Sequence, residues 1–330
     1  MRLRFFLSCI LLQLLDLVVH SSSSPLSDRQ KRDADFASVR NKLSRDHSGR
    51  KGDPPGKYFH ESTFHPHYDG RFASIPLPDE DRHKHLRALM RTYLATMTSI
   101  GAETWIMHGT LLGWWWNRKI MPWDTDVDVQ ISESSMRFLA DFYNMTMHHF
   151  KLPGISMEKG RSYLLEVNPN WRNGSTADTL NMIDARWIDT DTGLYIDITT
   201  LRRDTYAEEK GLKGRMMCKD KHHYLAEEIF PLRTSVFEGV EVRIPFMYTR
   251  LLEEEYGARS LVNRHFDHYY FNERTMDWEY NGRPGGRRGR PDTDVPGSSP
   301  GPPPPREKVL RHAGHQLVEP ELTVLGPDDV

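Results

Sequence analysis

The sequence predicts a mixed α/β fold, in which helices and strands alternate within one folded domain. Three observations support this. Apolar residues follow the helical period over residues 79–100. A strand, a glycine turn, a helix and a second strand follow one another over residues 104–131. Two apolar strands, over residues 182–188 and 194–199, flank a turn rich in Asp, Thr and Gly.

The helix expected over residues 79–100 has clear boundary signals. Pro78 precedes it, Asp79 can cap its N-terminus, and Gly101 can close its C-terminus. Its apolar side chains would form one face against the core, and they are Leu86, Leu89, Met90, Tyr93, Leu94, Met97 and Ile100.

Residues 104–117 predict a phosphate-binding layout. Residues 104–107 are expected to form a strand, Gly109 and Thr110 a tight turn, and residues 111–117 a helix. A helix N-terminus after a glycine turn presents unpaired backbone N–H groups, which attract phosphate. Gly109 and Thr110 are therefore the predicted phosphate-holding turn.

Three aspartates then alternate with β-branched apolar residues. If this stretch is a strand, the apolar residues face the core, and Asp124, Asp126 and Asp128 lie in a row on the other face. Clustered carboxylates repel one another, and a divalent cation such as Mg²⁺ relieves that cost. A solvated acidic turn is the alternative. The alternation with β-branched residues favours the metal site.

A second carboxylate strand is expected downstream. Ser132 can cap a helix running to about residue 143, with Met136, Leu139 and Phe142 inward, and residues 163–167 form a strand. Asp197 then lies within the otherwise apolar strand 194–199.

Asp197 has two interpretations. It could pair with Arg202 or Arg203. Alternatively, sheet pairing brings it beside Asp126 and Asp128 as a third metal carboxylate, and this second interpretation is favoured.

The C-terminal half predicts a hairpin over residues 236–244, turning at Glu238 and Gly239, then a helix over residues 246–256. Regular structure should end near residue 280. Cys218, His222 and His223 could contribute to a zinc site, but without a second Cys nearby packed or substrate-facing histidines are favoured. The histidines between residues 60 and 67 match no zinc-finger spacing, so the aromatic segment 57–77 should pack in extended form along the domain.

Composition and charge limit the expected partners and divide the chain into segments. Its 44 basic and 46 acidic residues nearly cancel, so we expect no nucleic-acid partner. Residues 1–21 predict a cleaved signal peptide or, alternatively, an uncleaved signal anchor, the one case in which we expect membrane contact. A disordered stem over 22–56, a folded domain over 57–280 and a disordered Gly/Pro/Arg-rich tail over 281–330 follow. In the secretory pathway, Asn144 and Asn173 would be usable glycosylation sites.

Several motifs resemble the LicD/fukutin family. They are His108-Gly-Thr-Leu-Leu-Gly113 with Arg118, Pro122-Trp-Asp-Thr-Asp-Val-Asp128, Gly193-Leu-Tyr-Ile-Asp197 and Pro231-Leu-Arg-Thr-Ser-Val-Phe-Glu-Gly239. The sequence between residues 113 and 123 is similar to that of the fungal branch linked to mannosylphosphate addition on cell-wall glycans. The resemblance implies a nucleotidyltransferase-like fold, a mixed sheet with packed helices. It further implies transfer of a phosphorylated sugar, alditol or choline from a nucleotide diphosphate donor to a glycan hydroxyl.

The resemblance assigns roles to the predicted site. Asp126 and Asp128 fill the metal-binding pair, Asp197 the third carboxylate, and Gly109 and Thr110 the phosphate turn. The cofactor would be Mg²⁺ or Mn²⁺.

Other expectations follow from the residues and from the resemblance. His108 and Arg118 could neutralise the leaving nucleotide, while core packing is the alternative for His108. The fungal resemblance points to GDP-mannose as the donor, a glycoprotein glycan as the acceptor and the Golgi lumen as the location. Two other functions stay open: an Asp-x-Asp glycosyltransferase that moves sugar without phosphate, and a non-catalytic regulator of a partner transferase.

Overall fold

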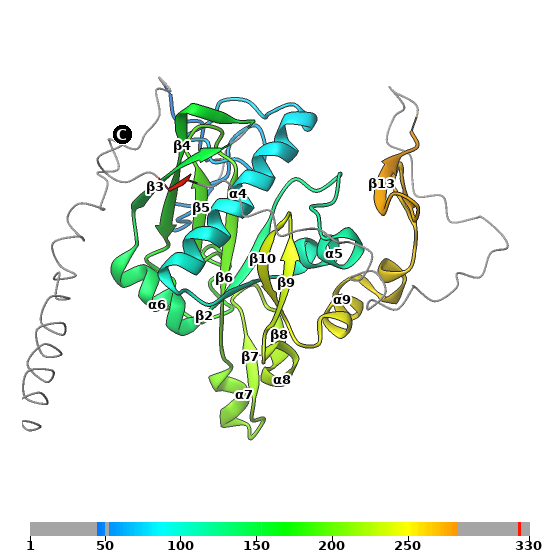
Figure 1. Cartoon of the computed structure of the whole chain (residues 1–330). Coiled ribbons are helices and arrows are strands. Elements are labelled where there is room, and N and C mark those ends of the chain that lie inside the picture. The colour runs from blue at the N-terminus through cyan, green and yellow to red at the C-terminus, as the bar shows by residue number, and fades with distance from the viewer. Residues whose placement is uncertain (1–44, 50–52, 153, 283–322, 325–330) are drawn as a thin grey trace, which may run out of the picture.

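The structure is a computed structural model that describes residues 45–49, 53–152, 154–282 and 323–324 (Figure 1). The predicted signal segment, most of the predicted stem and nearly all of the predicted tail lie outside the described residues. The domain boundaries therefore stay predictions.

The main sheet of the described residues has nine strands and mixed direction. Its main path runs β1-β2-β6-β5-β4-β3-β14, and β7 and β8 extend from β6. Strands β2 and β6 pair in parallel, whereas the other pairs are antiparallel. The predicted mixed sheet with packed helices is thus confirmed. The bounds are β1 Thr104–Ile106, β2 Asp128–Ser132, β3 Thr146–Leu152, β4 Ser156–Val167, β5 Ala185–Asp189, β6 Tyr195–Arg203, β7 Arg215–Met217, β8 His223–Leu225 and β14 Thr323–Val324.

The long helix α4, Asp79–Ile100, covers one face of the sheet and contacts β5, β6 and β10 (Figure 1). Gly101 adopts φ 74 and closes the helix as predicted. The predicted cap at Asp79 is wrong. Pro78 occupies the N-cap, and the Asp79 carboxylate accepts from Arg82 Nη1 at 2.7 Å instead.

Two shorter helices follow. Helix α5, His108–Asn117, starts earlier than predicted, so Gly109 and Thr110 belong to its first turn rather than to a separate turn. Helix α6, Glu133–Phe142, is capped by Ser132, whose hydroxyl accepts from Ser135 N–H, as predicted. Phe142 was expected to face inward but is 48% exposed, because it lies on the last turn of α6.

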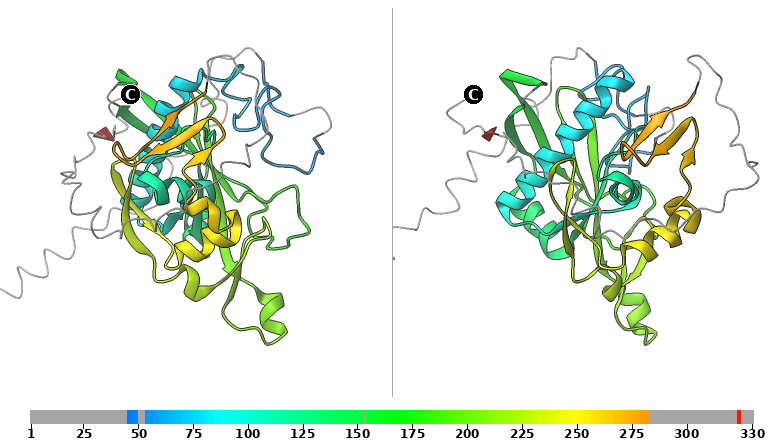
Figure 2. Two further views of the ribbon diagram at one scale, coloured as in Figure 1. Left: turned by 90° about the vertical axis from the view of Figure 1, so that its right-hand side faces the viewer. Right: turned by 45° about the vertical axis from the view of Figure 1, so that its right-hand side comes forward.

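The segment 53–77 lies on the sheet face opposite α4 (Figure 2). Tyr68 is fully buried and bridges to Leu194, and Phe72 packs in a second core cluster with residues of β4, β5 and β6. The aromatic segment therefore packs along the domain as expected, and it brings His67 Nε2 to 3.7 Å from Asp126 Oδ2, just before the start of β2.

The C-terminal elements complete the domain. The predicted hairpin forms from β9, Arg233–Phe237, and β10, Val240–Ile244, and helix α9 spans Tyr248–Tyr256. The turn residues of the hairpin, Glu238 and Gly239, both have positive φ, at 51° and 81°. The remaining elements are α7 Thr205–Glu209, α8 Ala226–Ile229, η1 Ala258–Leu261, β11 His265–Phe266, β12 Tyr269–Asn272 and β13 Asp277–Tyr280.

Gly113 fixes the packing of α5 against the chain that leaves it. A Cβ at Gly113 would lie 2.5 Å from the backbone oxygen of Lys119. We predict that Gly113→Ala lowers the free energy of unfolding by about 1–3 kcal/mol, because the backbone must shift. Gly56→Ala is the control, since its Cβ would lie 3.6 Å from Leu180 Cδ1, an ordinary contact. Urea denaturation of both variants tests this, and equal stability would contradict it.

Candidate functional site

The parallel pairing of β2 and β6 brings two predicted carboxylates together. Asp128 is the register partner of Asp197. The expected row of three aspartates on one strand is wrong, because β2 begins only at Asp128. Asp124 and Asp126 lie in the preceding loop, where Asp124 N–H donates to Met121 O at 2.9 Å. The four carboxylates nevertheless act on one another electrostatically.

Burial and mutual repulsion change the proton affinity of these groups. Burial, followed by the hydrogen bond and charge of Asp126, raises the pKa of Asp124 to about 8. Burial and the charges of Asp126, Asp197, Asp124 and Glu255 hold the pKa of Asp128 well above its ordinary value. Carboxylates in such a setting gain from a nearby cation.

Asp197 has a partner that the sequence did not reveal. Arg186 Nε donates to Asp197 Oδ1 at 2.7 Å across the β5–β6 pair. The candidates Arg202 and Arg203 bind Asp184 and Glu208 instead, because they lie at the far end of β6. Burial raises the pKa of Asp197, and the Arg186 charge opposes that rise. Asp197 is therefore both ion-paired and adjacent to Asp128.

The first turn of α5 borders the aspartates. A Cβ at Gly109 would lie 3.3 Å from Asp124 Oδ2, so glycine lets the loop approach the helix. Thr110 is buried, and its Oγ1 accepts from Asp128 N–H at 2.9 Å. The Thr110 hydroxyl thus braces β2. Contact between the backbone N–H groups of this turn and a phosphate stays a prediction.

A group of histidines and acids lies on the other side of this turn. His108 Nδ1 and Glu255 Oε1 are 2.8 Å apart, and the rings of His108 and His222 are 4.5 Å apart. His222 Nδ1 lies 3.1 Å from Asp220 Oδ2. His108, His222 and Glu255 each offer a ligand atom, and these atoms lie within 4.8 Å of one another.

The other two members of the Cys218, His222, His223 pattern point elsewhere. Cys218 is buried and accepts from Gln130 Nε2 at 3.4 Å. His223 Nδ1 lies 3.2 Å from Asp204 Oδ2. Within this pattern, only His222 reaches the site.

An open cavity of about 410 Å³ lies beside Asp126 and Asp197. His67 is part of its wall, with Nε2 at 3.7 Å from Asp126 Oδ2 and Nδ1 at 2.7 Å from Thr125 Oγ1. The lining residues are Asp53, Lys57, Glu61, Pro66, His67, Asp126, Val127, Tyr195 and Asp197. His67 and Glu255 are site residues that the sequence analysis missed. His67 belongs to the histidine-rich segment 60–67, but nothing in the sequence near Glu255 distinguishes it.

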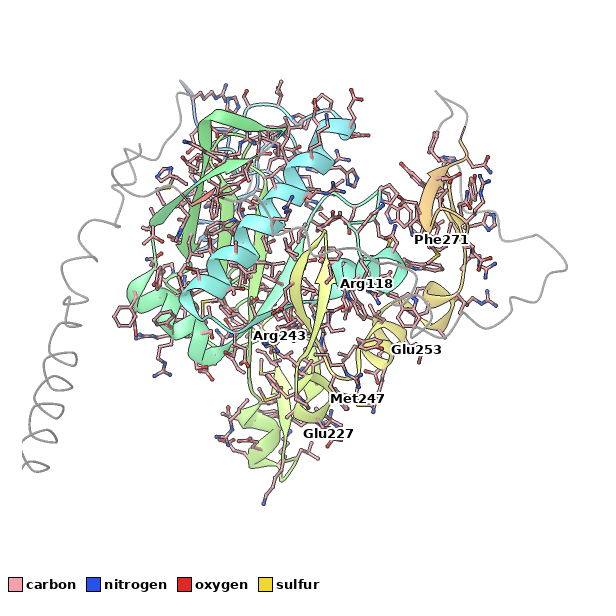
Figure 3. The ribbon with its side chains drawn as sticks, in the orientation of Figure 1. Arg118, Glu227, Arg243, Met247, Glu253 and Phe271 are labelled. Carbon is pink, nitrogen blue, oxygen red and sulfur yellow. The ribbon has the colours of Figure 1, made fainter. Side chains whose placement is uncertain are left out.

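The structure does not bring Arg118 to the aspartates. Arg118 follows the last residue of α5, and ten helical residues rise about 15 Å. Its guanidinium lies over the Trp114 ring, 3.9 Å from the ring centroid. Figure 3 shows Arg118 at the end of α5 that faces Phe271 and the small sheet β11–β13. A contact between Arg118 and a phosphate held at the first turn of α5 is therefore not supported.

The two predicted glycosylation sites are on the surface. Asn144 and Asn173 are both exposed. Their modification stays a prediction. Among the residues that the structure describes, no helix combines the length and apolar character needed to cross a bilayer.

Comparisons with known proteins agree with the resemblance. Residues 101–246 match the family profile described as LicD/FKTN/FKRP, nucleotidyltransferase domain. Mannosyltransferase regulator 4 of Saccharomyces cerevisiae is 34% identical over 138 residues, which are 41% of this chain and 11% of that relative. Mannosyltransferase regulator 14 of the same yeast is 33% identical over 139 residues, 41% of this chain and 14% of that relative. The matched part of the chain thus spans about a tenth to a seventh of these relatives.

The raised pKa of Asp124 predicts how stability depends on pH. The folded chain holds this proton up to about pH 8, whereas the ordinary value is 3.8. The contribution of this proton to the free energy of unfolding is complete below about pH 4. It declines as the pH rises and is lost above about pH 8. The melting temperature of the metal-free protein should therefore fall from pH 5 to pH 8, and less so in Asp124→Asn.

Asp267→Asn is the matched control, because Asp267 lies in the turn between β11 and β12 and Asn tolerates its φ of 52. Its melting curve should follow the wild type at each pH. A wild-type slope in Asp124→Asn would contradict the role given to this carboxyl.

Proposed function

We propose that this chain, whose residues 101–246 match the LicD/FKTN/FKRP nucleotidyltransferase-domain profile, modifies glycans by metal-dependent transfer of a phosphosugar. The proposal is supported chiefly by the pairing of Asp128 with Asp197 beside Asp124, Asp126 and the start of α5. Phosphoryl transfer is mostly a matter of positioning and charge neutralisation, and this arrangement suits both.

The carboxylates fit a hard divalent cation. Asp126, Asp128 and Asp197 would hold Mg²⁺ or Mn²⁺, with Asp124 next to them. The raised pKa values of Asp124 and Asp128 are the observation behind this fit, since burial and then the neighbouring carboxylates disfavour their ionised forms, and a bound cation would favour them. When bound, the ion neutralises the donor diphosphate and the developing charge on the leaving group.

The protein residues position the reactants. The backbone N–H groups at the start of α5 hold donor phosphate, and Arg186 keeps Asp197 in place. The acceptor glycan enters the open cavity beside His67. Its hydroxyl oxygen bonds to the phosphorus that carries the sugar, and the bond from that phosphorus to the bridging oxygen breaks. Nucleoside monophosphate leaves, and its phosphate takes up the hydroxyl proton.

The donor, the acceptor and the location are further parts of the proposal. Both are named mannosyltransferase regulators, so we propose GDP-mannose as donor, a mannose-containing glycoprotein glycan as acceptor and the Golgi lumen as location. The same names favour a second candidate, a non-catalytic regulator that acts on a partner mannosyltransferase.

Product mass tests the proposal. The protein is incubated with Mn²⁺, GDP-mannose and a mannose oligosaccharide, and the mass of the product is measured by mass spectrometry. We expect a gain of one hexose plus phosphate. Asp126→Asn should reduce this about 100-fold or more while the fold is kept, because the Asp126 side chain is 38% exposed. Asp267→Asn should react normally.

The other outcomes are distinct. A gain of hexose alone would support the ordinary glycosyltransferase. No product with GDP, CDP or UDP donors would overturn the enzyme proposal. In that case, stimulation of a partner mannosyltransferase to the same extent by wild type and Asp126→Asn would support the regulator.

A further inference from the structure

His108, His222, Asp220 and Glu255 form a cluster of two imidazoles and two carboxylates. They come from three places in the chain: the start of α5, the loop before β8, and the end of α9. Asp220 Oδ2 lies 3.1 Å from His222 Nδ1 and 3.9 Å from His108 Nε2, so it stands between the two rings. Glu255 closes the other side of His108 at 2.8 Å.

Among the described residues, one nitrogen of His108 takes no part in the hydrogen bonds of the cluster. Glu255 satisfies Nδ1 of His108, yet Nε2 of the same ring is buried and has no hydrogen-bond partner among the described residues. The His108 side chain is only 11% exposed, so bulk water reaches it poorly. One nitrogen of His108 thus faces Glu255, and the other faces Asp220 Oδ2 at 3.9 Å. The ring can therefore give Nδ1 to an ion shared with Glu255, while Asp220 orients the ring through Nε2.

We propose that His108, His222 and Glu255 bind a divalent transition-metal ion of the zinc class, with Asp220 beside them. Imidazole nitrogen suits Zn²⁺ and its neighbours better than Mg²⁺, which prefers oxygen ligands alone. The ligand atoms lie within 4.8 Å of one another, a spacing that a small side-chain adjustment brings to the bonding distances of such an ion.

The site is separate in chemistry from the aspartates but adjacent to them. The negative charge of Glu255 helps to raise the pKa of Asp128. A Cβ at Gly109 would lie within 4 Å of both Asp124 and Tyr256. A metal here would join α5 to α9 at the turn where phosphate is proposed to bind. The inference does not depend on phosphosugar transfer, since a regulator of the same fold could hold the same ion.

Zinc binding to the full chain, made without a polyhistidine tag and stripped with a chelator, tests the proposal. Calorimetry should show one Zn²⁺ bound per chain, and bound Co²⁺ should show the strong visible absorption of a nitrogen-ligated, four-coordinate ion. His222→Ala and Glu255→Gln should each weaken Zn²⁺ binding at least about 10-fold. His223→Ala is the matched control, because the neighbouring His223 faces Asp204, and it should bind as the wild type does.

A further variant separates this site from the aspartates. Asp126→Asn should keep the Zn²⁺ affinity and the Co²⁺ spectrum even though transfer is lost, and melting curves show whether each variant is folded. Unchanged affinity in folded His222→Ala and Glu255→Gln would overturn the inference. So would a weak Co²⁺ spectrum typical of oxygen-only ligands.

Discussion

Burial of carboxylates, together with their mutual repulsion, is the constraint on which the centre of this molecule depends. The parallel pairing of β2 with β6 places Asp128 opposite Asp197, and the loop before β2 adds Asp124 and Asp126. Partly buried negative charges at such close quarters disfavour the ionised state. The surrounding fold therefore has to compensate for them, and much of the local structure can be understood as that compensation.

The compensation comes from several directions. Arg186 neutralises Asp197 from the neighbouring strand, and its guanidinium is itself enclosed by aromatic rings, 3.7 Å from the ring centroid of Tyr195. Thr110 accepts from the backbone N–H of Asp128. Gly109 removes a side chain that would displace Asp124. Together they hold the carboxylates in place without filling the space that a cation and a donor phosphate would need.

Local signals in the sequence predicted the elements well. The period of α4, the Ser132 cap and the Glu238-Gly239 turn depend on residues close in the chain, so each could be identified from the sequence. The site was predictable in the local motif from His108 to Asp128 and at Asp197, where a carboxylate interrupts an apolar strand. Contacts between distant segments, such as Glu255 with His108, leave no periodic or spacing signal. Arg118 shows that membership of the motif does not fix position, since it follows the last residue of α5 while the aspartates border the first turn.

The aromatic contacts of Trp123 show which part of the chain is needed to support the aspartate loop. Trp123 directly precedes Asp124, and its ring packs 4.8 Å from Phe266 and 4.9 Å from Trp278, measured between centroids. The family match ends at residue 246, before either of these partners. The loop that carries two of the aspartates is therefore buttressed by C-terminal residues that lie outside the matched segment. A fragment trimmed to the shared segment would keep the motif but lose its support.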